Sequence, residues 1–140
     1  MHVIEIIKEK LGRYPHVRFD EGIGTIRVLP ADEVVFVVGL HADDGSFTVT
    51  FDGWHEDFLN ESDALNCFAF GLSDKARLKV ASRGGFDYHW TLERRQGDTW
   101  VADSTVGLLL FPFWRKRSIR YLQNHLICGE DQKVSRAFSH

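Results

Sequence analysis

The sequence predicts an α+β domain: a mostly antiparallel sheet of about six to eight strands, with N-terminal, central and C-terminal helices covering one face. Three observations predict this class. Apolar residues repeat at helical spacing near the start, in the middle and near the end of the chain. Between these segments they alternate with polar residues, as they do along strands. Most strand segments are joined by short turns rich in Gly and Asp, which favours hairpins and antiparallel pairing.

The first part of the chain begins with a helical pattern. Its broad apolar face predicts a helix over residues 2–11, ended by Gly12. Alternation over residues 17–29 then predicts two short strands that turn at Glu21-Gly22.

The most secure local prediction is a hairpin. Residues 34–38 are apolar on both faces, which is typical of a strand in the centre of a sheet. Asp43-Asp44-Gly45 has the composition of a turn, and residues 47–51 alternate between apolar and polar. We therefore expect a hairpin from Val34 to Phe51.

After Gly53 the period changes. Leu65, Phe68, Ala69 and Leu72 have helical spacing, so we expect a helix over about residues 62–71, capped by Asn60 or Ser62. Alternation returns in three later segments, which predict strands joined by turns at Gly84-Gly85 and Gly97: residues 77–80, 86–93 and 100–104.

The end of the chain carries two different patterns. Residues 107–114 are densely apolar but contain Pro112, so a strand there would stop near Phe111 or lie at an edge. Ile119, Leu122 and Leu126 have the spacing of an amphipathic C-terminal helix. We expect residues 1–128 to form one domain and residues 129–140 to be a flexible tail.

Composition limits the class of protein. The chain has 140 residues, of which 44% are hydrophobic and 26% charged, as in ordinary globular domains. No apolar run is long enough to span a bilayer, and the first residues lack a secretory pattern. We therefore expect a cytoplasmic protein in which Cys67 and Cys128 are free thiols.

Charge is divided along the chain. Residues 28–74 hold ten acidic residues and no lysine or arginine, whereas residues 75–120 hold ten basic residues and four acidic ones. Two interpretations follow. The opposite charges could pair across one sheet, each exposed pair contributing little. Alternatively, an acidic face and a basic face could steer a charged partner or favour self-association.

No motif predicts catalysis or metal binding. His41, His55 and the nearby acids lack the spacing of a zinc or calcium site, and a hairpin would separate His41 from His55, so we expect no metal and no cofactor. Cys67 falls beside an apolar stripe and is expected to be a buried thiol. We therefore assign no catalytic residue, and no motif points to a family of known function.

Residues 111–120 are the strongest candidate for a binding site, because aromatic residues stand next to clustered bases. This composition suits an anchor in a protein or ligand, or contact with a nucleic acid or an anionic membrane. The pI near 6.1 disfavours a dedicated nucleic-acid binder. Three bases at the start of the predicted C-terminal helix would also attract an anion. The candidate residues are Phe113, Trp114, Arg115, Lys116, Arg117 and Arg120.

The sequence therefore favours a non-enzymatic module that binds a protein partner or itself through its charged faces and this aromatic and basic segment. The alternative is a small-molecule-binding protein or small enzyme. It would use a pocket between sheet and helices lined by some of the four tryptophans, with His55, His89 or an acid as its polar group.

Overall fold

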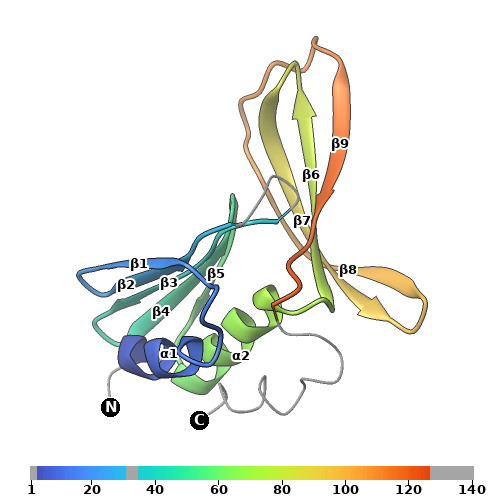
Figure 1. The fold of residues 1–140 in the computed structure, drawn as a ribbon. Coiled ribbons are helices and arrows are strands. Elements are labelled where there is room, and N and C mark those ends of the chain that lie inside the picture. Colours follow the sequence, from blue (N-terminus) through green and yellow to red (C-terminus); the bar gives the residue numbers. More distant parts are fainter. Residues whose placement is uncertain (1–2, 31–34, 127–140) are drawn as a thin grey trace.

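The computed structural model describes residues 3–30 and 35–126, and within them it contains two helices and nine antiparallel strands (Figure 1). The predicted α+β class with antiparallel pairing is confirmed. The strands form two sheets rather than one, of five and four strands.

The first sheet is a simple meander in which every strand pairs with the next along the chain, in the order β1-β2-β3-β4-β5. Its strands are β1 (Phe19–Gly22), β2 (Thr25–Val28), β3 (Val38–Asp43), β4 (Ser46–Phe51) and β5 (Trp54–Phe58). The predicted hairpin is confirmed as β3–β4, with the turn where it was expected. The central strand is Val38–Asp43, however, and of the apolar run 34–38 that was expected to be central it includes only Val38. Residues 35–37 precede the first pair of the β3–β4 ladder and belong to no strand.

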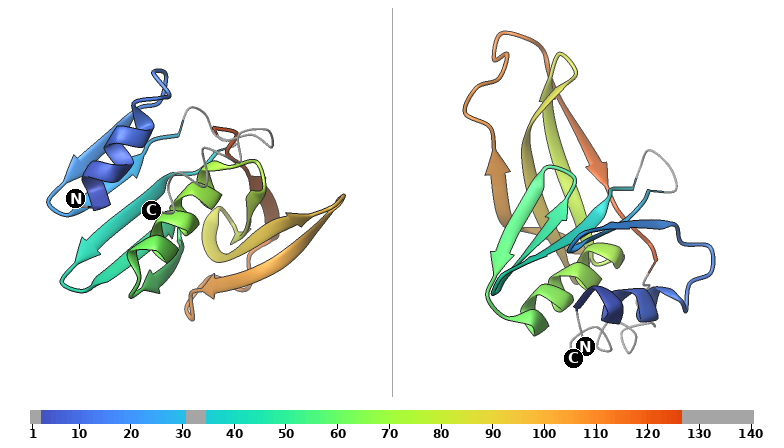
Figure 2. Two further views of the ribbon diagram at one scale, coloured as in Figure 1. Left: turned by 90° about the horizontal axis from the view of Figure 1, so that it is seen from below. Right: turned by 90° about the vertical axis from the view of Figure 1, so that its left-hand side faces the viewer.

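Two helices cover one face of the first sheet: α1 (Val3–Leu11) and α2 (Glu61–Leu72) (Figure 2). The apolar side of α1 is buried at Val3, Ile4, Ile7 and Leu11, as its spacing predicted. The N-terminus of α2 is capped by Asn60, whose Oδ1 accepts a hydrogen bond from the backbone N–H of Asp63 at 3.1 Å. Both predicted helices are confirmed.

The second sheet has the strand order β8-β7-β6-β9. Its strands are β6 (Ala76–Arg83), β7 (Phe86–Gln96), β8 (Thr99–Gly107) and β9 (Arg117–Leu122). Its lower part packs on the first sheet and α2, and its upper part extends well beyond them (Figures 1 and 2). We call this projecting part, with the β6–β7 turn and the connection from β8 to β9, the arm.

The two sheets share one apolar core, which includes Val49, Phe51 and Trp54 of the first sheet and Leu78 and Trp90 of the second. Two polar contacts reinforce the junction. Trp54 Nε1 donates to Ser104 Oγ at 2.9 Å, and Trp90 Nε1 donates to Asp52 Oδ2 at 3.0 Å. Each tryptophan thereby buries its rings and still satisfies its N–H.

The prediction of a single sheet was wrong because β5 was overlooked. Its sequence is Trp-His-Glu-Asp-Phe, and its three central residues are exposed, so only its two ends are apolar. Strand β5 completes the first sheet, and α2 then carries the chain away before β6 begins the second sheet.

The predicted C-terminal helix was also wrong, because Arg117–Leu122 forms β9. The helical spacing from Ile119 to Leu122 is short and equally compatible with a strand end. Strand β9 pairs with β6, which contains the buried residues Leu78 and Val80. Without β9, the backbone N–H and C=O groups on this edge of β6 would be unpaired. Tertiary pairing therefore overrides a weak helical period. The predicted tail at 129–140, like Cys128, lies outside the described residues.

No helix in the described part of the chain is long and apolar enough to cross a membrane.

Candidate functional site

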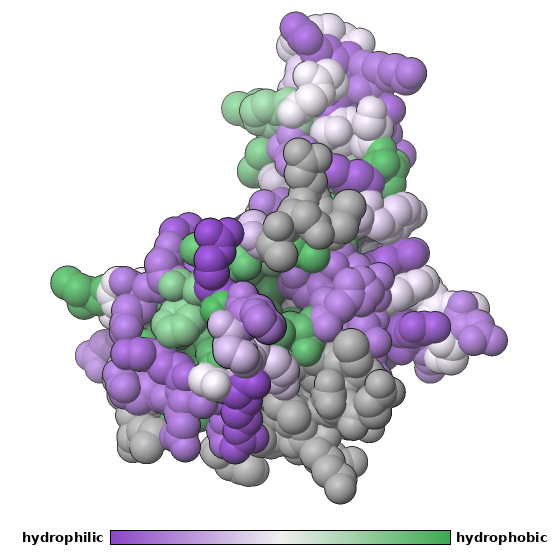
Figure 3. All heavy atoms as spheres, in the orientation of Figure 1, coloured by the Kyte–Doolittle hydropathy of each residue, from purple (hydrophilic) through white to green (hydrophobic). Residues whose placement is uncertain are grey.

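The connection from β8 to β9, residues 108–116, runs along the arm and is called the arm loop. Four of its large apolar side chains are mainly in solvent: Leu109 is 96% exposed, Leu110 87%, Phe113 69% and Trp114 72%. Hydrophobic surface is visible on the projecting arm in Figure 3. Single exposed apolar residues are ordinary, whereas several on one loop indicate an interaction surface.

The backbone of the arm loop is held against the sheet. At its start, Leu108 N–H donates to the carbonyl of Tyr88 at 2.8 Å, and the ring of Phe111 stacks on Tyr88 with centroids 4.2 Å apart. At its end, Gly84 N–H donates to the carbonyl of Lys116 at 3.0 Å. These contacts hold both ends of the arm-loop backbone on the second sheet, while its large apolar side chains remain exposed.

The β6–β7 turn is shaped to receive the end of this loop. Arg83 Nη1 donates to the carbonyl of Arg115 at 3.1 Å. Gly84 has a φ of +58°, and a Cβ there would lie 2.2 Å from the Arg115 side chain. Only glycine therefore fits without displacing Arg115.

The six residues predicted from the sequence fall into two groups. Phe113, Trp114, Arg115 and Lys116 are exposed together on the arm loop. The other two face the sheet: Arg117 Nε donates to the Tyr88 hydroxyl at 3.0 Å, and Arg120 makes a two-pronged contact with Asp87 at 2.7 and 2.8 Å.

The contacts of these two arginines affect titration. Burial alone raises the pKa of Tyr88, but hydrogen bonds and charge from Arg117 and Arg83 outweigh it and leave this pKa below its ordinary value. The hydrogen bond from Arg120 to Asp87 raises the pKa of Arg120. Because Arg115 and Lys116 lie on the arm loop and Arg117 begins strand β9, no helix starts here and the helix-dipole argument for an anion site does not apply.

The four tryptophans do not converge on one pocket. Trp54 and Trp90 are buried in the core. Trp100 stacks against the guanidinium of Arg77, 4.5 Å from its ring centroid, on the second sheet. Trp114 is on the arm loop. Of the expected polar groups, His55 is exposed on β5 and His89 is half-buried on β7.

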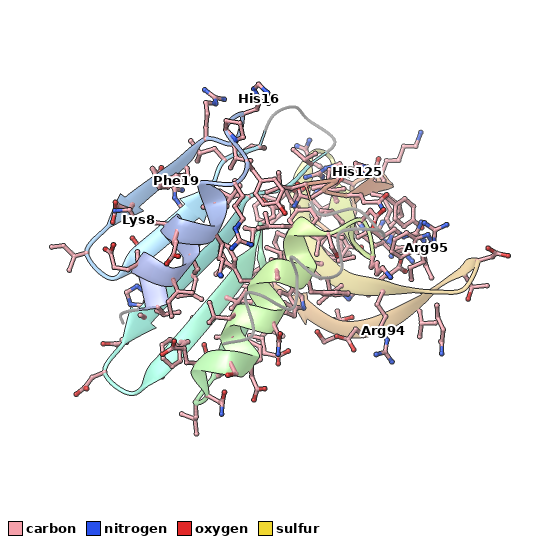
Figure 4. The ribbon with its side chains drawn as sticks, turned by 60° about the horizontal axis from the view of Figure 1, so that its bottom comes forward. Lys8, His16, Phe19, Arg94, Arg95 and His125 are labelled. Atoms are coloured by element: carbon pink, nitrogen blue, oxygen red, sulfur yellow. The ribbon has the colours of Figure 1, made fainter. Side chains whose placement is uncertain are left out.

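A cleft of about 450 Å³ lies between the two sheets and α2. The alternative prediction placed an aromatic-lined pocket with an acidic group between sheet and helices, but of the residues in this cleft it named only Trp54. Its apolar walls include Trp54, Phe58, Phe70 and Leu92, and its charged groups are Glu56, Arg94 and Asp103; Asn66 and Cys67 complete the lining. The alternation of Trp54, Glu56 and Phe58 was the signal that could have indicated one wall. Arg94 and its neighbour Arg95 project to opposite faces of β7, and Arg94 is the one that lines the cleft (Figure 4).

Cys67 stands in this cleft as a protonated thiol. Burial, together with the smaller effect of the negative charges of Glu56 and Asp103, raises its pKa to about 12. A thiol of this kind is a poor nucleophile at neutral pH. With two carboxylates and one guanidinium among its lining residues, the cleft has apolar walls and a net negative charge.

The histidines and acids considered for metal binding are distributed along the first sheet. His41 pairs with Thr48 near one end of the β3–β4 hairpin, whereas His55 pairs with Thr50 on the next ladder. Glu56 and Asp57 are consecutive on β5 and so face opposite sides. Within the described residues, no three His, Cys, Asp or Glu side chains gather as a metal site would require.

Among the described residues, no salt bridge joins the acidic segment 28–74 to the basic segment 75–120. Within the described residues, the ion pairs join Lys8 to Glu5 and Glu21, Arg27 to Asp20, Arg77 to Glu93 and Arg120 to Asp87. None of them links an acidic residue of segment 28–74 to a basic residue of segment 75–120. The expected pairing across the sheet is therefore not seen in this part of the chain.

Searches of family models, of curated proteins and of solved structures find nothing similar to this chain. The fold and site define a two-sheet α+β protein with a projecting arm and an exposed aromatic and basic loop.

Proposed function

We propose that the chain is a non-enzymatic protein-binding module that self-associates through its arm loop. The observation that carries this proposal is the exposure of Leu109, Leu110, Phe113 and Trp114 on a loop whose backbone is fixed to the sheet. Fully burying a large apolar side chain contributes about 1.5–3 kcal/mol, so covering even two of them would support an association.

Charge favours an acidic protein surface as the partner. Arg115 and Lys116 stand beside the exposed aromatic side chains, and neither takes part in the ion pairs found in the described residues. A second copy of the chain offers such a surface, because segment 28–74 is acidic and forms β3, β4, β5 and α2. Attraction between opposite charges would also speed the encounter.

Sedimentation velocity over a range of protein concentrations tests this proposal. We expect a species larger than the monomer at low ionic strength and a weaker association as salt screens the charges. A fourfold variant, in which Leu109, Leu110, Phe113 and Trp114 are all replaced by Ser, should remain monomeric.

The matched control replaces Ile23 and Leu59 by Ser, because these side chains are 100% and 87% exposed but lie away from the arm. The control should associate like the wild type. A wild type that stays monomeric at every concentration and salt, or a fourfold variant that associates as well as the wild type, would overturn the proposal.

A further inference from the structure

We infer that the cleft between the two sheets is the receptor for the arm loop of a second copy, with Phe113 or Trp114 inserted into it. This inference rests on the proposed self-association and names the surface that receives the loop. The chain would then carry both halves of a head-to-tail contact.

The cleft has a suitable size and lining. Its volume of about 450 Å³ is within the range of about 300–1,000 Å³ in which proteins enclose small ligands, so it has room for an aromatic side chain. Trp54, Phe58 and Phe70 contribute aromatic walls. Aromatic pairs add about 0.5–1.5 kcal/mol beyond the burial of their area, which favours an aromatic guest.

The charges of the two surfaces are complementary. Glu56 and Asp103 line the cleft with a single cation, Arg94, and none of the three belongs to the ion pairs found in the described residues. Cys67 lines the same cleft, and the charges of Glu56 and Asp103 both contribute to raising its pKa, after burial. One negative charge is thus unmatched, and Arg115 or Lys116 of an incoming loop can compensate it.

The arm loop cannot fill the cleft of its own chain. Its basic end is bonded to the β6–β7 turn through Gly84 and Arg83. Arg94 lies eight residues beyond Phe86, the first residue of β7, which corresponds to about 26 Å along a strand. The loop is bonded to Tyr88 and Gly84, near the start of β7, whereas Leu92 and Arg94 of β7 line the cleft toward its other end. The loop that enters a cleft must therefore come from another copy.

The test is complementation between two variants. In the cleft variant, Glu56→Lys and Asp103→Lys reverse the charge of two exposed side chains. In the loop variant, Phe113→Ser and Trp114→Ser remove the aromatic guest. Thermal unfolding of each should match the wild type, since none of the four side chains is buried.

Each variant alone should sediment as a monomer. Mixed, they should form a one-to-one complex, because the intact loop of the cleft variant meets the intact cleft of the loop variant. The control variant Asp44→Lys and Asp98→Lys makes the same change of charge at exposed turn positions outside the cleft. It should associate like the wild type.

The other outcomes overturn the inference in distinguishable ways. If the cleft variant associates like the wild type while the loop variant does not, self-association through the loop stands and the receptor lies elsewhere. If the wild type is monomeric, both proposals fail. If the monomeric wild type co-sediments with anionic phosphatidylserine vesicles and the cleft substitutions leave this unchanged, the loop binds a lipid surface instead.

Discussion

The indole N–H of Trp90 donates to the carboxylate of Asp52, and this contact joins β7 of the second sheet to the β4–β5 turn of the first. Asp52 adopts a left-handed conformation with φ of 54°, which brings its side chain to Trp90. A Cβ on the next residue, Gly53, would lie 2.2 Å from the Trp90 ring. The two sheets therefore pack closely at Gly53, because the Trp90 ring occupies the space that a side chain at this position would need.

Replacing Gly53 by Ala should destabilise the protein by about 1–3 kcal/mol or more, because the added methyl group overpacks a rigid ring against backbone. Chemical denaturation measures this effect. Gly45→Ala is the comparison: Gly45 has a φ of +78° but open space around its Cβ position, so it should show only the backbone strain, about 1–2 kcal/mol. Equal stability of Gly53→Ala and the wild type would show that the sheets can separate at this point.

The Trp90–Asp52 hydrogen bond should give a measurable coupling energy. In a double-mutant cycle of Trp90→Phe and Asp52→Ala, followed by urea denaturation, we expect about 1.5–3 kcal/mol, the range for hydrogen bonds to a charged group. Additive effects of the two substitutions would mean that Trp90 contributes through packing alone.

Truncation of Trp54 should lower the free energy of unfolding strongly, whereas truncation of Trp114 should leave it nearly unchanged. Trp54 is 1% exposed and stacks on Phe51 with ring centroids 4.8 Å apart, so Trp54→Ala should cost about 3–5 kcal/mol of unfolding free energy. Trp114 is 72% exposed, so Trp114→Ala should change this free energy by no more than about 0.5 kcal/mol. A large loss of stability in Trp114→Ala would place that ring in the core.

Cys67 should make the folded state sensitive to alkali. Its pKa is raised to about 12 in the folded protein, against about 8.5 in an unfolded chain. Below about pH 8.5 both states keep the proton and no stability is lost. As the pH rises toward 12, the unfolded state loses this proton first, so unfolding becomes favoured by at most about 1.4 kcal/mol per pH unit.

This effect is isolated by comparing Cys67→Ala with Cys67 in a Cys128→Ser background, with unfolding free energies measured from pH 7.5 to 10.5. Tyrosines and lysines titrate in both proteins, so their contribution cancels in the difference. The Cys67 protein should lose stability more steeply above about pH 8.5. Parallel pH profiles would contradict the elevated pKa.

Features that depend on neighbours in the sequence were predictable. The spacing of Leu65, Phe68 and Leu72 and the cap at Asn60 indicated α2, and the turn at Asp43-Asp44-Gly45 indicated the β3–β4 hairpin. Side-chain periodicity and turn chemistry act over a few residues, so the sequence records them directly. The aromatic and basic composition of the arm loop was visible for the same reason.

Features that depend on distant partners were decided only by the tertiary structure. Residues 117–122 form a strand because β6 offers them an edge, although the spacing of Ile119, Leu122 and Leu126 suggested a helix. The exposure of Trp114 and the burial of Trp54 follow from where the two sheets pack, which no local pattern encodes. The cleft likewise requires β5, α2, β7 and β8 together. The physical reason is that burial, edge pairing and cavities are properties of surfaces brought together by folding, whereas a sequence pattern describes one element at a time.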